Sequence, residues 1–366
     1  MNLQVLQEDF SKAINLASRF TSLRAQLPIL ANVLLSTSKN KLIISATNLE
    51  ISINLSIGAK IEKEGQITVP ARVLNEILVS LNPNPIRLIS EKENLQILTP
   101  SFNSTLAGMN ASDFPQIPQK LDKDRLKFKR EALMDSLNQV LFAVSVDETR
   151  PVLTGVLFVF KKQNLELVAT DGFRLSRKIL ALEKTDVAEK IILPKNILGE
   201  IVRLPAGQEE INFSFKKADN QAVFEIEGIY FSSRVIEGDF PDYEKIIPKS
   251  SKVKIRLDKE DFLQAIKLAS VFARDSANVV KFLVKENELE VLAESSFSGS
   301  QKTTLAAKVE GEKMEIAFNF RFLQDFLQVV KGEEVLVELS GSNLPGVFLD
   351  PKDKDFLHLI MPVRID

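Results

Sequence analysis

The chain has little of the side-chain chemistry that enzymes commonly use. Among its 366 residues it has no cysteine and one histidine, His358. This histidine lies in the alternating segment FLHLIM, where the period of two favours a structural role in a strand over catalysis or metal binding. The motifs GxxxxGK[ST], HExxH and GxSxG are all missing from the sequence. We therefore expect no active site, metal site or cofactor, and predict that the chain is not an enzyme.

Two carboxylates are close enough in sequence to bind a cation together. Asp239 and Asp242 flank Phe240 and Pro241. Carboxylate oxygens are suitable ligands for hard cations, but a turn accounts for the same four residues without a metal. We favour the turn.

Composition indicates an ordinary globular protein with several cores. The 45% hydrophobic content and the length favour two or three domains. No uncharged apolar run is long enough to span a membrane, so we expect a cytoplasmic protein. The 47 basic and 49 acidic residues give a net charge of -2. A nucleic-acid role would therefore require positive charge that is concentrated locally.

A repeat organises the chain. Residues 8–18, EDFSKAINLAS, and residues 260–270, EDFLQAIKLAS, agree at eight of eleven positions, and EALMDSLNQVL at 131–141 is a fainter third copy. About 60 residues after each copy a second helix is predicted to open, at Pro70, Pro194 and Asn319. In the first two cases we expect the proline in the first helical turn, where its missing N–H has no partner to lose.

The segments between these helices are typical of antiparallel strands. Val335, Val337 and Leu339 alternate with polar residues, as in a sheet with one buried face. We predict an α+β protein of three repeated domains, each with two helices packed on antiparallel sheets. Proline-bearing, charged joins place the domains at 1–123, 124–251 and 252–366.

The repeated helices present polar and partly basic faces. On the first helix, Lys12 and Arg19 lie opposite the apolar face. Lys195 and Lys267 are similarly placed on later helices, although acidic residues share these helices. A solvated helix face is the ordinary explanation of such charges. If six such helices lined one hole, their summed charge would suit a phosphate backbone, with weak, salt-sensitive contact.

Three units cannot easily surround a duplex, but two copies of the chain supply six. We therefore expect a homodimer whose contact uses the two ends of the three-unit arc. Candidate contact residues are Phe102 and Leu106 in the first unit and Val271 and Phe272 in the third.

The whole chain resembles one known family, the β subunit of bacterial DNA polymerase III, which is a sliding clamp. No single motif is decisive, but their order and spacing together are specific. The motifs are LPIL (27–30), TVPAR (68–72), DFP (113–115), RPVLTGVLF (150–158), ATDGFRLS (169–176), GDFPDYEKIIP (238–248) and the terminal IMPVRI.

This resemblance implies a head-to-tail homodimeric ring that encircles duplex DNA, is opened by an ATP-driven clamp loader and tethers the replicative polymerase. It also implies an apolar pocket between the second and third domains for short peptides of polymerase, loader and repair proteins. Aliphatic and methionine walls would accept several peptide sequences, and Arg174 would orient them. Matched by motif, the pocket residues are Arg150, Leu153, Thr170, Gly172, Phe173, Arg174, Leu175, Pro241, Ile246, Leu359, Met361, Pro362, Val363 and Arg364.

The resemblance also gives DNA-facing residues, Arg24 before LPIL and Arg72 after TVP. The chain departs from better-known relatives at three places. Pro151 and Val152 stand where some relatives carry aromatic residues, and Phe173 stands where histidine is frequent. Residues 295–304 carry only Lys302 as a charge, where relatives can show an acidic cluster.

Two other classes of function are open at this point. One is an enzyme that uses pocket carboxylates and Arg174 on a small polar substrate. The other is a peptide-binding repeat scaffold that never encircles DNA. The Asp-Gly pair in ATDGFR by itself is also explained by a plain hairpin turn.

Overall fold

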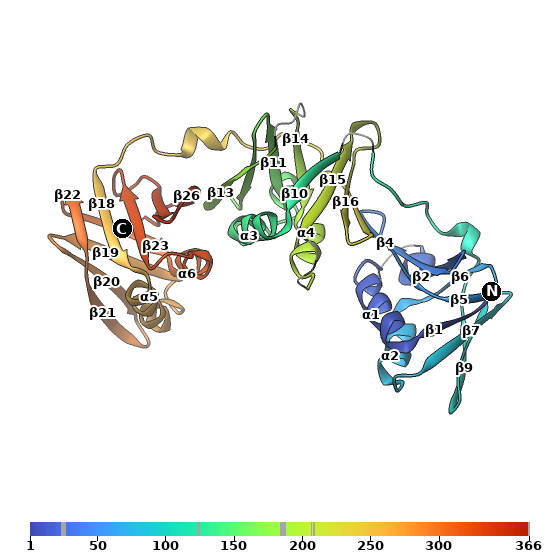
Figure 1. Ribbon diagram of the computed structural model, residues 1–366. Helices are drawn as coiled ribbons and strands as arrows, with labels where there is room; N and C mark the ends of the chain where they lie inside the picture. The colour runs from blue at the N-terminus through green and yellow to red at the C-terminus, as the bar shows by residue number, and fades with distance from the viewer. Residues whose placement is uncertain (23–26, 123–124, 184–187, 206, 208, 365–366) are drawn as a thin grey trace. The chain divides into compact units, whose positions relative to one another are not determined.

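The structure is a computed structural model that describes residues 1–22, 27–122, 125–183, 188–205, 207 and 209–364. Helices occur where the repeat predicts them, and antiparallel sheets make up most of the rest (Figure 1). No helix in the described ranges is long and apolar enough to cross a membrane. The α-helices are α1 (Gln7–Ser18), α2 (Ala71–Ser80), α3 (Arg130–Leu141), α4 (Lys195–Val202), α5 (Lys259–Ala273) and α6 (Phe320–Val329).

The chain forms two compact units, of which unit 1 comprises Met1–Arg130 and Pro205–Val235. Its smaller sheet has the order β5–β1–β7–β8–β9 and its larger sheet the order β10–β15–β16–β17–β4–β3–β2–β6. The bounds of the smaller sheet are β1 (Asn2–Leu6), β5 (Lys60–Lys63), β7 (Pro85–Glu91), β8 (Asn94–Thr99) and β9 (Phe102–Ala107). Those of the larger are β2 (Asn32–Ser38), β3 (Lys41–Thr47), β4 (Ile51–Gly58), β6 (Gln66–Pro70), β10 (Arg125–Lys129), β15 (Glu210–Lys216), β16 (Gln221–Ile226) and β17 (Ile229–Arg234).

Unit 2 comprises Glu131–Leu204 and Ile236–Asp366. Its sheets have the orders β14–β11–β12–β13–β26–β25–β24–β18–β22 and β21–β20–β19–β23. The bounds of the larger sheet are β11 (Gly155–Lys161), β12 (Asn164–Thr170), β13 (Arg174–Ala181), β14 (Lys190–Pro194), β18 (Val253–Asp258), β22 (Lys308–Gly311), β24 (Glu334–Leu339), β25 (Gly346–Asp350) and β26 (Asp353–Ile360). Those of the smaller are β19 (Val279–Lys285), β20 (Glu288–Ser295), β21 (Gly299–Ala306) and β23 (Met314–Asn319).

Strand order repeats with the sequence. β2 pairs with β3 and β6, β11 pairs with β12 and β14, and β19 pairs with β20 and β23. The alternation predicted for one face holds, because Val335, Val337 and Leu339 on β24 are fully buried. The fold is therefore the predicted α+β arrangement, and the same strand pairing occurs in each of the three repeats.

Helix ends follow local chemistry. Asn319 caps α6, because its Oδ1 accepts a hydrogen bond from the Arg321 N–H at 3.0 Å, and Asp258 caps α5 in the same way. Pro70 and Pro194 are the last residues of β6 and β14 and precede their helices. The expectation that they lie within the first turn is wrong by one residue, because each still pairs in its sheet, with Asn32 or Gly155.

Aromatic rings fill the core of the C-terminal part of unit 2. Phe262, Phe282, Phe318, Phe348 and Phe326 form a chain of tilted or edge-on contacts, with centroid separations of 5.4 to 5.8 Å. These rings join α5, β19, β23, β25 and α6. Each ring buries a large apolar area, so this core holds both helices to their sheets.

Candidate functional site at the junction of β13 and β26

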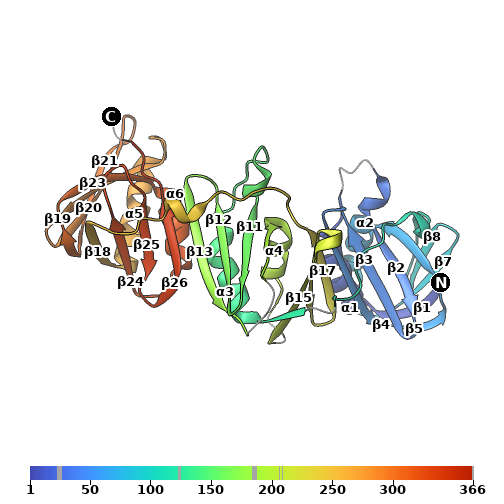
Figure 2. The same ribbon diagram turned by 90° about the horizontal axis from the view of Figure 1, so that it is seen from above.

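The nine-stranded sheet of unit 2 is continuous across two sequence repeats. β13 from the second repeat pairs antiparallel with β26 from the third, with Leu175 opposite Leu359 and Ser176 opposite His358. In Figure 2 the strands β11, β12 and β13 continue into β26 and β25. The predicted pocket residues lie around this junction.

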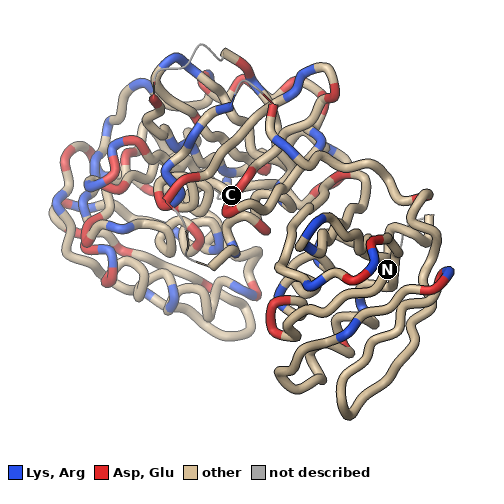
Figure 3. Tube along the Cα trace, turned by 45° about the vertical axis from the view of Figure 1, so that its right-hand side comes forward, with Lys and Arg blue, Asp and Glu red and all other residues tan. Residues whose placement is uncertain are grey.

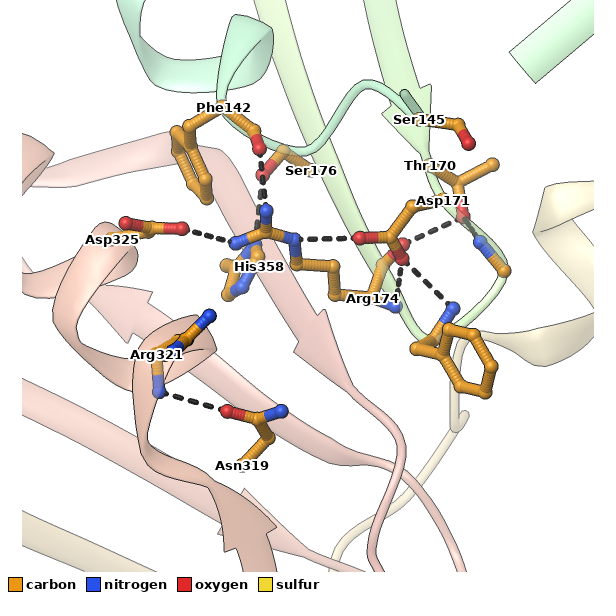
Figure 4. Close-up of polar contacts among 12 residues, drawn as sticks. Phe142, Ser145, Thr170, Asp171, Arg174, Ser176, Asn319, Arg321, Asp325 and His358 are labelled. Atoms are coloured by element: carbon orange, nitrogen blue, oxygen red, sulfur yellow. Dashed lines mark hydrogen bonds and ion pairs between the residues drawn. The ribbon is translucent and has the colours of Figure 1, made fainter. Parts of the chain in front are cut away.

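Arg174 is the polar centre of the junction (Figure 4). Its guanidinium donates hydrogen bonds to Asp171 Oδ2 at 2.9 Å, Asp325 Oδ2 at 2.6 Å and the Phe142 carbonyl at 2.7 Å. The guanidinium carbon also lies 4.5 Å from the centroid of the Phe322 ring. A planar guanidinium can donate to several acceptors at its edge while its face stacks on a ring, so Arg174 ties β13 to α6 and to the end of α3.

The role of Arg174 in orienting a ligand stays a prediction. Its side chain is 10% exposed, and three hydrogen bonds hold the guanidinium to Asp171, Asp325 and the Phe142 carbonyl. The enzyme hypothesis also needed this guanidinium to be available to a substrate. Lys195 lies beside the same group: burial lowers its pKa, the Arg174 charge lowers it further, and Asp325 offsets this in part. Lys195 is thus not a freely solvated helix residue.

His358 is fully buried on the helix side of the junction. Its Nδ1 lies 2.7 Å from Ser176 Oγ, and its ring stacks on Phe326 at a centroid distance of 5.5 Å. Desolvation, followed by the Arg174 charge, holds the pKa of His358 well below its ordinary value. The histidine is a neutral packing residue, in agreement with the structural role predicted for it.

The turn between β12 and β13 is fixed by its own side chains. Thr170 Oγ1 accepts from the Gly172 N–H at 3.0 Å and donates to the Arg174 carbonyl at 2.6 Å. Asp171 Oδ1 accepts from the N–H groups of Phe173 and Arg174. Gly172 has φ of 94°, and the Arg150 guanidinium closes over it. The result is a rigid turn that holds the Phe173 side chain outward, 63% exposed.

The face of the junction away from the helices is apolar. Leu175, Leu359 and Tyr243 pack there in one cluster with neighbouring strands. Tyr243 belongs to the single-turn helix η5 (Tyr243–Ile246). Burial and the adjacent Glu166 carboxylate, which accepts a hydrogen bond from it, raise the pKa of Tyr243. This anchor keeps the segment that carries Pro241 and Ile246 on the sheet.

The predicted pocket residues divide into a floor and a rim. Leu153, Thr170, Leu175 and Leu359 are buried, so they support the surface from beneath. Rim residues with substantial exposure are Arg150, Phe173, Ile246 and Met361. Within the rim, the Met361 N–H donates to the Phe173 carbonyl at 2.8 Å and joins the end of β26 to the start of β13.

The C-terminal segment continues beyond this rim. The Val363 N–H donates to the Ala317 carbonyl at 2.8 Å, which fixes Pro362 and Arg364 on either side of it. A cavity of about 510 Å³ opens there, lined by Lys313, Met314, Glu315, Ile316, Ala317, Ser342, Asn343 and Val363. The C-terminal segment therefore borders a cavity of its own through Val363.

Comparison with known proteins assigns the family. Sequence profiles of the DNA polymerase III beta subunit match in three consecutive pieces: the N-terminal domain at residues 1–118, the central domain at 127–242 and the C-terminal domain at 244–364. The chain belongs to the DNA polymerase III beta subunit family. This confirms the resemblance that its motifs indicate.

Individual clamps match over their full lengths. The beta sliding clamps of Staphylococcus epidermidis and Staphylococcus aureus are 32% and 30% identical, with all of this chain and 99% of each relative covered. The sliding clamp structure from Bacillus subtilis has a TM-score of 0.96 at 28% identity, with both chains fully covered. The Thermotoga maritima beta subunit has a TM-score of 0.92 at 25% identity. The predicted clamp fold and sliding-clamp function are confirmed.

Charges of this clamp are interspersed along the chain (Figure 3). Lys12, Arg19 and Lys267 are exposed on their helices, whereas Arg72 is engaged by Glu76 at 2.9 Å. Arg24 lies outside the described residues. Surface pairs of this kind contribute little stability and are easily exchanged for other partners.

The predicted contact residues of the clamp differ in accessibility. Val271 is exposed and Phe102 is half-buried on β9. The Leu106 side chain is buried in unit 1, and Phe272 packs against the α5 core. Leu106 and much of Phe272 therefore pack within their own units, and the assignment of the four residues to a subunit contact stays a prediction.

Sequence reasoning missed the three partners of Arg174 at the junction, which are Phe142, Asp325 and Asp171. Asp171 carried a signal, because an Asx side chain before glycine often binds backbone N–H groups. Asp325 carried none, since a carboxylate on a helix 151 residues away from its arginine looks like any solvated residue.

Proposed function

We propose that two copies of this chain form a head-to-tail ring that encircles duplex DNA and tethers the replicative polymerase. The ring has six domains, three per chain with the bounds 1–123, 124–251 and 252–366, and is opened by an ATP-driven loader. It acts in the cytoplasm, needs no cofactor and has no active site of its own. Family membership over the whole chain supports this role.

The pairing of strands between repeats is the structural observation that supports a ring of two chains. Two junctions within the chain join a strand of one repeat to the last strand of the next: β4 pairs with β17 and β13 pairs with β26. The corresponding strands left over are β21 and β9, and each is the edge of its sheet in the described part of the chain. Pairing β21 of one copy with the partner's β9 repeats the junction and closes a ring of two chains.

Topology explains how a chain of net charge -2 holds DNA. A closed ring needs no tight contact, so a few exposed cations such as Lys12, Arg19 and Lys267 are sufficient for weak, sequence-independent attraction. Arg24, Arg72 and Lys195 complete the proposed DNA-facing set.

Retention on DNA tests the ring directly. After loading, the clamp should remain on nicked circular DNA and leave when the circle is linearised. Equal retention on both forms would support the scaffold that never encircles DNA and remove topology as the mechanism.

The junction of β13 and β26 is the proposed site for partner peptides. Its rim of Phe173, Ile246 and Met361, above the floor of Leu175 and Leu359, suits short apolar peptide segments. Arg150, Pro241, Pro362, Val363 and Arg364 border it.

Met361→Asp should abolish binding of a clamp-binding peptide by calorimetry, because a charge would be desolvated against the apolar rim. Leu49→Asp is the control: Leu49 is also an exposed apolar residue, and it lies in unit 1 in the turn between β3 and β4, away from the proposed site. Equal affinity of wild type and Met361→Asp would remove this site.

Dimerisation is tested at Val271 rather than Phe272, because Phe272 also packs inside its own unit. Val271→Glu should give monomers at micromolar concentration by light scattering. A persistent dimer would show that the contact lies elsewhere.

A further inference from the structure

The hairpin between β20 and β21 presents the most exposed large apolar side chain among the described residues, Phe297, at 90% exposed. The hairpin is not loosely held. Ser295 Oγ accepts from the N–H groups of Phe297 at 3.2 Å and Ser298 at 3.1 Å, and Ser298 Oγ donates to Asp275 Oδ2 at 3.1 Å. A phenyl ring on a fixed turn favours a contact surface over a random surface residue.

Unit 1 carries a cavity at the place where β9 ends. It has a volume of about 550 Å³ and is lined by Gln66, Lys92, Glu93, Asn94, Met109, Asn110 and Ala111. Its wall is fixed by backbone bonds from the Gly108 N–H to the Glu93 carbonyl at 2.6 Å and from the Met109 N–H to the Thr68 carbonyl at 3.0 Å. The cavity is therefore part of the folded unit.

The two junctions within the chain predict the strand register of the proposed junction between subunits, in which β21 pairs with the partner's β9. Ala46, Ala169 and Ala293 are equivalent buried residues, and each pairs with a residue of the strand that forms the junction: Ile53, Ser176 and Gln301. On the other side, β9 and β17 each follow a two-residue turn, so Ser104 corresponds to Phe231.

This register has a definite consequence for the subunit contact. Ile53 lies opposite Phe231 within unit 1, so Gln301 falls opposite the partner's Ser104. Three residues further along, Ser298 then meets the partner's Ala107. The internal counterparts of this last pair are backbone hydrogen bonds, from Arg234 N–H to the Glu50 carbonyl at 2.9 Å and from Met361 N–H to the Phe173 carbonyl at 2.8 Å.

We propose that Phe297 is a subunit-contact residue that seats in the partner's cavity at the end of β9, against the partner's Met109. The register brings Phe297 beside the partner's Gly108, directly before that methionine. A thioether is a favourable neighbour for an aromatic ring. This inference rests on the proposed head-to-tail dimer and adds to it an apolar anchor, at an edge strand whose only charge is Lys302.

Dimer affinity provides the first test. Phe297→Ala should weaken the dimer by about tenfold or more in sedimentation equilibrium, the scale of an anchoring aromatic residue. Phe173→Ala, at the exposed aromatic of the internal junction, should leave dimer affinity unchanged. Because Phe297 is exposed in the monomer, the melting temperature of the dissociated chain should match wild type and so exclude misfolding.

Cross-linking provides the second test, since the chain has no cysteine of its own. Phe297→Cys and Asn94→Cys chains, mixed and treated with a short bis-maleimide, should give a covalent dimer, and any such product must join different chains. The same mixture with Phe173→Cys in place of Phe297→Cys should give none.

The outcomes separate this proposal from the dimer itself. A wild-type dimer with unchanged affinity in Phe297→Ala and no cross-link overturns the Phe297 contact alone. A wild-type chain that stays monomeric at micromolar concentration overturns the proposed ring and the Phe297 contact together.

Discussion

Two strand junctions have the same antiparallel pairing: β4 with β17 in unit 1, and β13 with β26 in unit 2. They differ in which register position holds a polar pair of residues and which holds an apolar pair. In unit 1, Ser52 and Ser232 form a buried hydroxyl pair at 2.6 Å. The residues at the same register in unit 2 are Leu175 and Leu359. One position further along, the order reverses: unit 1 has Ile53 opposite Phe231, and unit 2 has Ser176 opposite His358.

The helix side of both junctions retains the same ring contact. Phe20 packs on Phe231 at a centroid distance of 5.8 Å, and Phe142 packs on His358 at 5.1 Å. The difference is that unit 2 places its polar pair here, next to Arg174, and its leucine pair on the opposite face. Only the unit 2 junction therefore has an apolar floor on the face that also carries exposed Phe173 and Met361.

The exchange suggests why one chain has one proposed peptide site rather than two. A hydrogen-bonded serine pair is satisfied and offers a ligand little apolar area, whereas a leucine pair beneath an open rim favours apolar ligands.

Leu359→Ala should have the largest effect on stability. It removes a fully buried side chain from the apolar cluster and leaves a cavity, which costs about 3 kcal/mol of unfolding free energy in unit 2. Ser232→Ala, at the equivalent position in unit 1, should cost about 1 kcal/mol. Urea unfolding followed by hydrogen exchange in each unit measures both; equal costs would contradict the contrast.

Arg174→Ala should destabilise unit 2 by about 2–3 kcal/mol, because it leaves a carbonyl and two carboxylates without their cation. This loss of stability is smaller than for a fully buried ion pair, because the Asp325 side chain is 37% exposed and solvent screens its charge. Arg72→Ala removes an exposed pair with Glu76 on α2 and serves as the control, with an expected change below about 1 kcal/mol. Thermal unfolding of both variants checks the difference.

His358 should make unit 2 sensitive to mild acid. Its folded pKa is lowered, so the unfolded chain binds the proton first: the stabilisation is complete above pH 6.5 and declines as pH falls below it. The slope should approach about 1.4 kcal/mol per pH unit. The double variant Ser176→Ile/His358→Phe copies the unit 1 pair and should flatten the profile between pH 5 and 6.5. An unchanged slope in that variant would assign the acid sensitivity to other groups.

The serine pair of unit 1 should give the smallest effect. Ser52→Ala alone leaves the Ser232 hydroxyl without this partner and should cost about 1 kcal/mol, whereas Ser52→Ala/Ser232→Ala should cost little more than either single change. A double-mutant cycle by chemical denaturation checks this. Strict additivity would mean that the two hydroxyls are not coupled.

Local sequence was enough for the elements and the repeat. Helix periodicity in EDFSKAINLAS, alternation in Val335 to Leu339 and the cap at Asn319 all depend on neighbours within a few residues, and those neighbours are printed in the chain. The same local chemistry made ATDGFR a turn. The family resemblance then supplied which residues gather at the site.

What only the tertiary structure decided is the state of those residues at the site. The sequence alone suggested that the Arg174 side chain is available to a ligand. In the structure it is paired with Asp325, 151 residues further along the chain. Likewise the sequence suggested Leu106 and Phe272 as subunit-contact residues, whereas in the structure both pack against the core of their own unit. Burial and ion pairing depend on which distant segments meet, and no local period records that meeting. The sequence alone thus determined the repeated units and their order, and the packing between repeats decided which side chains remain free to bind.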